Sequence, residues 1–382
     1  MARKLKILLC VNSFKESLDS VAINKLLAEE LASHKIQVFP ISDGGDGFLG
    51  VIRYNKKCHC KFYFIPAPLL DKKIKVEVFF DKKNVYVESA NVLGLKLIDI
   101  PERNPLKTTS YGLGILLKKV FSEPEFREKK MIIGIGGTST NDAGCGMAQA
   151  IGYQLKDSNE KELKIGGKYL QKLKQILIDE NLQIEFRKRQ IIAVADVENP
   201  LIGSKGSTKI YSKQKGASRK DINVLEMGMK NFSNVVQKAF GKKIKHSKMF
   251  GAGGGLAAGL NVFLNADVIS WREYFSLSKL ENEKFDFIIT GEGKIDSQSF
   301  DGKAVGEIYQ LSRKINSKLI LVCGSADEKS IPNKVMKEIH SLIALQKYFK
   351  NEEESCRKVT LGIRKASEEI KCAIQGWASL KT

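Results

Sequence analysis

The stretch KLKILLCVNSFKESLDSVAINKLLAEELASHKIQVFPISDGGDG, residues 4–47, decides the fold class. Residues 4–11 form an apolar run typical of a buried strand, and residues 18–33 carry apolar side chains at helical spacing. A second strand is expected at 35–42, and both strands end in polar or glycine-rich turns. Strand, turn, helix and strand in this order predict the opening of a doubly wound α/β domain.

The same pattern returns towards the other end of the chain. Residues 285–314 and 318–326 again indicate a strand, a loop, a helix and a strand, whereas residues 61–95 alternate like antiparallel strands. A chain of 382 residues also exceeds the usual size of a single core. We therefore predict an α/β protein in which 1–67 and 282–382 form a doubly wound Rossmann-like domain, with a second α/β domain, 68–281, inserted into it.

Composition narrows the cellular setting and the partners. The seven cysteines show no disulfide spacing, and the first residues lack the layout of a signal peptide, so we expect a cytoplasmic protein. No apolar stretch reaches the length of a membrane span, so no membrane partner is expected. The net charge of +20 comes from lysines dispersed along the chain without interleaved aromatics. This pattern favours a solvated surface, and a basic nucleic-acid-binding protein stays the alternative.

Five strand ends carry small, acidic or basic residues, in the segments NSFKES, SDGGDG, GGTSTND, ADVENP and TGEGKID. In open α/β sheets ligands bind at such ends, and glycines, hydroxyls, carboxylates and lysines together suit a phosphorylated ligand with Mg²⁺. The glycine-rich segment is no P-loop because no lysine follows the glycines, and Ser139 stands where a dinucleotide fingerprint needs glycine. Protein-kinase and serine-hydrolase signatures are also missing from the sequence.

Seven segments carry a resemblance to a known family, and they occur in the family's order over nearly the whole chain. They are NSFKESL, PISDGGDGF, IGIGGTSTNDAGCGMAQAIG, ADVENPLIGSKGS, SKQKGAS, GAGGGLAAGL and ITGEGKIDSQSFDGKA. The chain resembles the glycerate kinase family, which phosphorylates glycerate with ATP. The resemblance implies two α/β domains, ATP and Mg²⁺ as cofactors, and 2- or 3-phosphoglycerate as product. A homodimer stays open.

One departure from the family pattern bears on activity. The family usually has an aspartate where this chain has Asn12. If that carboxylate holds metal or substrate, the chain is instead a catalytically weak or regulatory relative that binds glycerate or nucleotide. This alternative stays open beside the kinase interpretation.

On the kinase interpretation the strand-end residues receive roles. Asp196 ends an apolar strand and suits a base or metal ligand, although an aspartate there also caps or turns a chain. Glu292 and Asp296 suit one Mg²⁺ loop, with helix capping as the structural alternative for Asp296. The predicted site comprises the catalytic residues Asp196, Lys15 and Asp43; the substrate-binding residues Ser13, Asp46 and Asn199; the nucleotide-binding residues Gly136, Gly137, Thr138, Thr140, Asn141, Gly253, Gly254 and Lys303; and the metal ligands Glu292 and Asp296.

Overall fold

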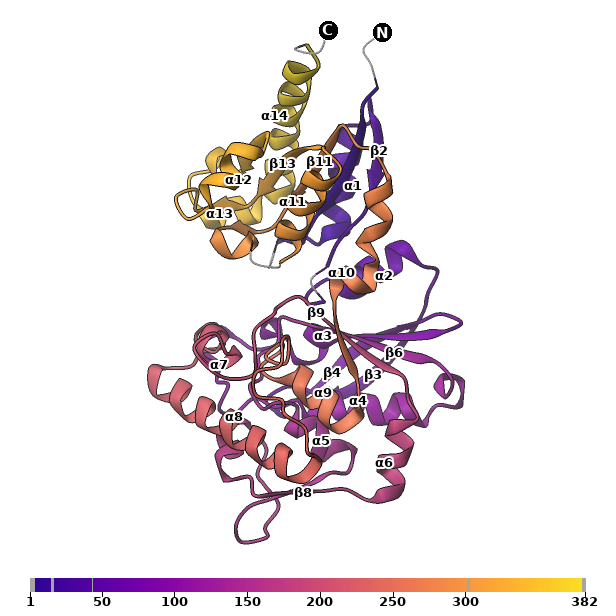
Figure 1. Ribbon diagram of the computed structural model, residues 1–382, viewed down its shortest axis with the longest axis vertical. Helices are drawn as coiled ribbons and strands as arrows, with labels where there is room; N and C mark the ends of the chain where they lie inside the picture. The colour runs from indigo at the N-terminus through magenta and orange to yellow at the C-terminus, as the bar shows by residue number, and fades with distance from the viewer. Residues whose placement is uncertain (1–3, 15–16, 43, 301–302, 380–382) are drawn as a thin grey trace. The chain divides into compact units, whose positions relative to one another are not determined.

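The computed structural model describes residues 4–14, 17–42, 44–300 and 303–379, and it divides into two compact units (Figure 1). Unit 1 comprises residues 1–43, 50–55 and 272–382, and unit 2 comprises residues 44–49 and 56–271. Two of the boundaries along the chain fall within helices α2 (Phe48–Asn55) and α10 (Trp271–Phe275). Both units are of α/β type, as the sequence predicts.

Unit 1 contains a five-stranded sheet in which every pair of neighbours is parallel, in the order β15-β13-β11-β1-β2. Both ends of the chain supply its strands, which are β1 (Lys6–Val11), β2 (Lys35–Val38), β11 (Phe287–Gly291), β13 (Lys318–Cys323) and β15 (Ser341–Ala344). The parallel sheet built from N- and C-terminal strands confirms the expected pairing of the two chain ends.

Helices cover this sheet because alternate strand residues point to opposite faces. On one face Ile7, Leu9 and Ile289 share a core with Leu27 of α1 (Ser20–Glu30) and Ile363 of α14 (Val359–Ser379). Helix α11 (Ala304–Lys314) contacts β11 and β13. The short elements of the unit are α12 (Asn333–Glu338), α13 (Glu352–Arg357) and the paired β12 (Lys294–Ile295) and β14 (Ser325–Ala326).

Unit 2 contains a separate six-stranded mixed sheet in the order β10-β9-β6-β5-β4-β3. Its strands are β3 (His59–Pro66), β4 (Lys73–Phe80), β5 (Asn84–Glu88), β6 (Lys130–Ile135), β9 (Ile191–Ala195) and β10 (Asp267–Ser270). The first three run antiparallel, which confirms the alternation predicted for 61–95, and the rest are parallel. Strand β3 thus lies in unit 2, whereas the domain division near 67 and 282 stays a prediction.

The core of unit 2 gathers apolar side chains of this sheet and of three helices, α4 (Tyr111–Ser122), α5 (Cys145–Ile151) and α9 (Leu256–Leu264). Helix α8 (Arg219–Phe240) begins with a capping box, in which Ser218 and Asp221 each accept the backbone N–H of the other. The remaining elements are α3 (Ser89–Leu93), α6 (Glu180–Arg187), α7 (Ser207–Tyr211), β7 (Gln154–Lys156) and β8 (Gln175–Leu177).

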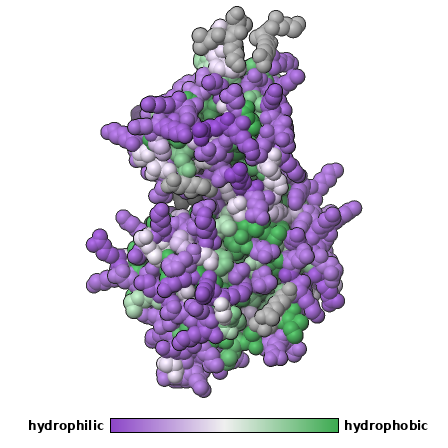
Figure 2. Space-filling view, viewed as in Figure 1, coloured by the Kyte–Doolittle hydropathy of each residue, from purple (hydrophilic) through white to green (hydrophobic). Residues whose placement is uncertain are grey.

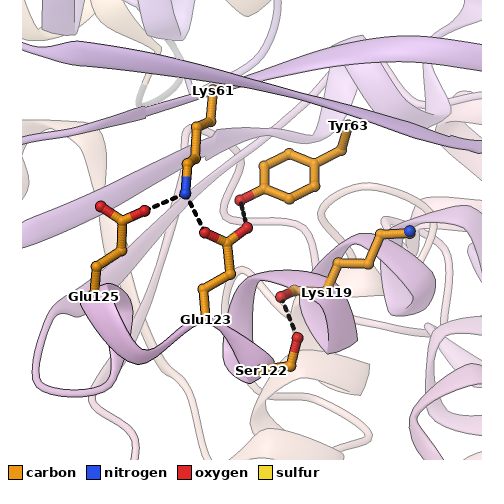
Figure 3. Close-up of polar contacts among 6 residues, drawn as sticks. All are labelled: Lys61, Tyr63, Lys119, Ser122, Glu123 and Glu125. Carbon is orange, nitrogen blue, oxygen red and sulfur yellow. Dashed lines mark hydrogen bonds and ion pairs between the residues drawn. The ribbon is translucent and has the colours of Figure 1, made fainter.

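A polar cluster fastens the edge strand β3 to the segment that follows α4 (Figure 3). Lys61 of β3 forms ion pairs with Glu123 and Glu125, and the Tyr63 hydroxyl donates a hydrogen bond of 2.5 Å to Glu123. Burial and the Glu123 carboxylate raise the pKa of Tyr63.

Hydrophilic residues cover most of the face drawn in Figure 2, and hydrophobic ones appear there in small groups. This agrees with the dispersed Lys and Arg residues of the sequence. Within the residues that the structure describes, none of the helices combines the length and the apolar character needed to cross a membrane.

Candidate active site

Three neighbouring parallel strands of unit 2 end at one edge of the sheet. Glu88 at the end of β5 lies opposite Gly134 of β6, and Ile135 at the end of β6 lies opposite Ala195 of β9. Glu88, the loop 136–144 and Asp196 therefore leave the sheet at the same edge. Because α/β proteins bind ligands at the carboxyl ends of parallel strands, this edge is the candidate site of unit 2.

The glycines of this edge let backbone segments approach one another closely. A Cβ atom on Gly136 would lie 2.5 Å from the Cα atom of Gly45, and one on Gly254 would lie 2.0 Å from the Thr140 carbonyl oxygen. Gly254 also has a φ angle of +68°, which other residues rarely adopt. The segments 44–47, 136–141 and 253–255 thus meet through their glycines. Nucleotide binding by Gly136, Gly137, Gly253 and Gly254 stays a prediction.

The carboxylate of Asp142 anchors the glycine-rich loop. It is 2% exposed, and its two oxygens accept five hydrogen bonds. The donors are the Thr109 hydroxyl (3.1 Å), the Ser110 N–H (2.7 Å) and hydroxyl (2.8 Å), and the N–H groups of Gly144 and Gly146 (both 3.2 Å). The loop is therefore held against the start of α4 by a carboxylate that is not among the predicted site residues.

A second acidic group, Glu88, holds the loop that carries the predicted residue Asp46. Its carboxylate accepts the N–H groups of Gly47 (3.2 Å) and Leu49 (3.0 Å). Burial raises the pKa of Glu88 to about 7, against the opposing effect of these N–H groups and of the Lys96 ammonium. Lys96 also pairs with Asp46, with 3.1 Å between Nζ and Oδ1. Asp46 therefore lies at the candidate edge with its charge partly neutralised.

Lys215 is a buried cation beside two of the predicted phosphate-binding residues. Its Nζ atom donates hydrogen bonds to the Thr140 carbonyl (2.7 Å) and the Thr138 hydroxyl (3.4 Å). Burial lowers the pKa of Lys215 to about 7 although Asp142 opposes the shift. Lys215 is not among the predicted site residues. Its place in SKQKGAS, one of the segments that carry the family resemblance, was the signal that could have found it.

Asp196 and Asn199 follow strand β9. Asp196 directly succeeds the last strand residue, Ala195, and is half-buried. The Asn199 amide donates to the Lys205 carbonyl (2.7 Å) and accepts the Tyr211 hydroxyl (2.8 Å), so both of its ends shape the loop that leads into α7. Substrate binding by Asn199 stays a prediction, as does the catalytic role of Asp196.

The remaining predicted residues belong to unit 1. Ser13 and Glu292 follow the neighbouring parallel strands β1 and β11, in which Val11 lies opposite Gly291. The Asn12 N–H donates to the Gly291 carbonyl (2.8 Å). Ser13 and Glu292 thus leave the five-stranded sheet at one edge.

Asp296 accepts the Gln298 N–H at 2.9 Å and so caps the 3₁₀ helix Ser297–Phe300, which is the structural alternative weighed for it. Lys303 is half-buried and immediately precedes α11. Lys15 and Asp43 lie outside the described residues. Among the residues that are described, no group of three or more His, Cys, Asp or Glu side chains could hold a metal ion. A magnesium site at Glu292 and Asp296 stays a prediction.

Comparison with known proteins decides the family. The sequence model of the Glycerate kinase family matches residues 7–375. The chain belongs to the glycerate kinase family. It is 34% identical over 329 residues to the Glycerate 2-kinase of Escherichia coli, covering 84% of this chain and 85% of that protein. It is 29% identical over 374 residues to a Glycerate kinase of Neisseria meningitidis, covering 96% and 98%.

A solved structure extends the likeness to the fold. The crystal structure of a protein named as glycerate kinase 2 from Salmonella typhimurium LT2 matches with a TM-score of 0.70 at 25% identity, covering 98% of this chain and 100% of that one. The fold of this chain therefore has a counterpart in that structure over nearly its whole length.

Proposed function

We propose that this glycerate kinase family member transfers the γ-phosphoryl group of ATP to a hydroxyl group of D-glycerate, giving 2- or 3-phosphoglycerate. The observation that carries the proposal is the family match over residues 7–375, which includes the strand-end loops of both sheets. Its relatives match over most of their own length as well as most of this chain.

Phosphoryl transfer needs positioning of the reactants, neutralisation of phosphate charge and removal of the hydroxyl proton. Asp196 at the end of β9 is the proposed acceptor of that proton. Thr138, Thr140 and Asn141, which lie in the loop after β6, are the proposed donors to phosphate oxygens. Ser13, Asp46 and Asn199 are proposed to bind glycerate.

Magnesium, when bound with ATP, supplies charge neutralisation to the phosphates. Such ions are commonly held by one or two carboxylates together with the phosphates themselves, so a cage of three acidic residues is not required. Glu292 is half-buried at a strand end, and Asp296 caps a helix with one oxygen. A carboxylate has about four lone-pair positions, so this cap leaves Asp296 capacity for an ion. Glu292 and Asp296 are the two residues proposed to hold Mg²⁺.

The proposal also covers the domain architecture. Unit 1 is proposed to be a doubly wound Rossmann-like domain, into which the second α/β domain is inserted. Helices from both chain ends pack on its parallel sheet, as such a domain requires. A cytoplasmic location and a homodimer stay predictions.

The weak or regulatory alternative rests on Asn12, whose side chain lies in the turn after β1. Asn12 is 5% exposed, and its Oδ1 atom accepts the Ser13 N–H at 2.8 Å. An aspartate would accept the same hydrogen bond, so asparagine preserves the turn after β1. The departure removes a charge but keeps the backbone that presents Ser13.

The test is ADP release from ATP over a panel of short hydroxy acids, with the product identified by phosphorus NMR. We expect the highest rate with D-glycerate, one phosphoglycerate as product, and loss of turnover with EDTA. Equal rates for lactate and glycerate would refute glycerate as the preferred substrate. Turnover unaffected by EDTA would refute the requirement for Mg²⁺. Salt-sensitive retention on DNA without turnover would instead favour the nucleic-acid alternative.

A further inference from the structure

Lys215 places an amino group inside unit 2 without a carboxylate partner. Its side chain is 4% exposed, and within the described ranges it forms no ion pair. The negative charge that acts on Lys215 is that of Asp142, whose carboxylate already accepts five hydrogen bonds. Burying an ammonium without a counter-ion is strongly unfavourable, so such groups are found chiefly at functional sites.

The segment that carries Lys215 turns a polar face towards the glycine-rich loop. Thr208 of α7, Ser212 and Lys215 follow one another at one-turn intervals, because Ser212 N–H donates to the Thr208 carbonyl and Lys215 N–H to the Ser212 carbonyl. From the loop side, the Asn141 amide donates to the Thr208 hydroxyl at 3.2 Å, and Thr140 accepts from Lys215. Two polar surfaces therefore meet in the interior.

Three atoms at this meeting have no hydrogen-bond partner among the described residues. They are Thr140 Oγ1, Asn141 Oδ1 and Ser212 Oγ, and their residues are at most 1% exposed. A buried polar atom left unpaired costs free energy. Two hydroxyl donors and an ammonium suit the oxygens of an anion, and the amide oxygen suits a ligand hydroxyl group.

We propose that Lys215 binds an anionic oxygen of the reactants, from the glycerate carboxylate or from a phosphate of ATP, with Thr140 and Ser212 as its neighbouring donors. The inference rests on the proposed function, since it assigns a ligand-binding residue to that site. An arriving anion gives the buried ammonium its counter-ion. Glycerate also offers hydroxyl groups that the Asn141 oxygen accepts.

The competing explanation is structural, with Lys215 only holding the Thr140 carbonyl in place. Lys215→Gln separates the two, because glutamine retains N–H donors for that carbonyl but carries no charge. Lys215→Met removes the donors as well. Lys213→Met is the matched control, because Lys213 lies on the same 3₁₀ helix, Lys213–Lys215, and is exposed.

The experiment measures binding by calorimetry, in separate titrations with D-glycerate and with a non-hydrolysable ATP analogue plus Mg²⁺, and the melting temperature of each variant. We expect Lys215→Gln to melt within a few degrees of the natural protein and to lose about 10- to 100-fold in affinity for one ligand, the worth of a charge-assisted hydrogen bond. The arm that loses affinity identifies the source of the anion. Lys213→Met should retain both affinities.

Affinities of Lys215→Gln and Lys215→Met within twofold of the natural protein for both ligands would overturn the proposal. So would equal losses for both ligands that parallel a fall in melting temperature, because they indicate a structural role. Turnover of the natural protein with glycerate is measured separately. Absence of that turnover counts against the proposed function, whereas the binding titrations report on Lys215 without any chemical step.

Discussion

Replacing Asp142 by asparagine tests the anchor of the glycine-rich loop most directly. Four of the five hydrogen bonds that Asp142 accepts end at Oδ2, and the fifth, from the Gly144 N–H, ends at Oδ1. The best placement of an asparagine keeps its oxygen at the position of Oδ2. Its amide nitrogen then faces the Gly144 N–H, so two donors oppose each other.

The magnitude follows from this geometry. One hydrogen bond to a charged acceptor is lost, and those that remain become neutral and weaker, so we expect a loss of about 2–4 kcal/mol in the free energy of unfolding. For a unit of this size that corresponds to a fall of roughly 4–16 °C in melting temperature. The side chain is 2% exposed, so water cannot replace the missing acceptor.

The measurement is denaturant unfolding of Asp142→Asn beside Asp157→Asn. Asp157 accepts N–H groups of Asn159 (2.8 Å) and Lys161 (3.1 Å) in an exposed turn, where asparagine serves equally well. We expect the control to change stability by no more than about 0.5 kcal/mol. If the two variants lose the same free energy, the carboxylate of Asp142 is no anchor and the loop is held by its backbone alone.

Three further predictions concern charge. Burial raises the pKa of Glu88 from 4.5 to about 7, so the folded state holds the Glu88 proton more tightly than the unfolded state does. The stability that this contributes, about 3 kcal/mol, is present below pH 4.5 and is lost as the pH rises through 7. Glu88→Gln should abolish this dependence of the unfolding free energy on pH. Asp196→Asn should keep the melting temperature within a few degrees while kcat falls about 10²–10⁴-fold in the ADP-release assay; a retained kcat would make Asp196 a cap. Asp296→Asn keeps the Gln298 hydrogen bond, so stability should hold while the Mg²⁺ concentration for half-maximal rate rises about tenfold. An unchanged magnesium requirement would leave Asp296 as a cap only.

The positions of several strands along the chain were predictable because they depend on local patterns. Apolar runs such as residues 4–11 and the alternation in 61–95 mark strands whatever their neighbours are. Strands β1, β4 and β5 lie within them, and β3 overlaps the second. The family resemblance was predictable for the same reason, because its segments are contiguous in sequence. Strand-end residues such as Asp196 followed from the rule on carboxyl ends of parallel strands.

The buried charged residues were not predictable, because their surroundings come from distant parts of the chain. Glu88 ends the apolar run VYVE, but nothing nearby shows that N–H groups of Gly47 and Leu49 point at it. Lys215 is one of 63 Lys and Arg residues, and only the packing of its segment against residues 138–141 distinguishes it. Burial beneath these distant segments gives each of these side chains its unusual pKa.

In the glycine-rich stretch, close packing of the backbone and the predicted binding of phosphate involve the same residues. A Cβ atom on Gly134 would lie 2.6 Å from a ring carbon of Phe48, and one on Gly254 would lie 2.0 Å from the Thr140 carbonyl, so alanine at either position displaces a packed segment whether or not phosphate binds there. Lost activity in such glycine variants would therefore report on packing. Side chains that end in a functional group, as Lys215 and Asp196 do, can be changed without moving the backbone. The assignment of ligand-binding roles consequently rests on those side chains, and the glycines are first of all the means by which segments 44–47, 136–141 and 253–255 come together.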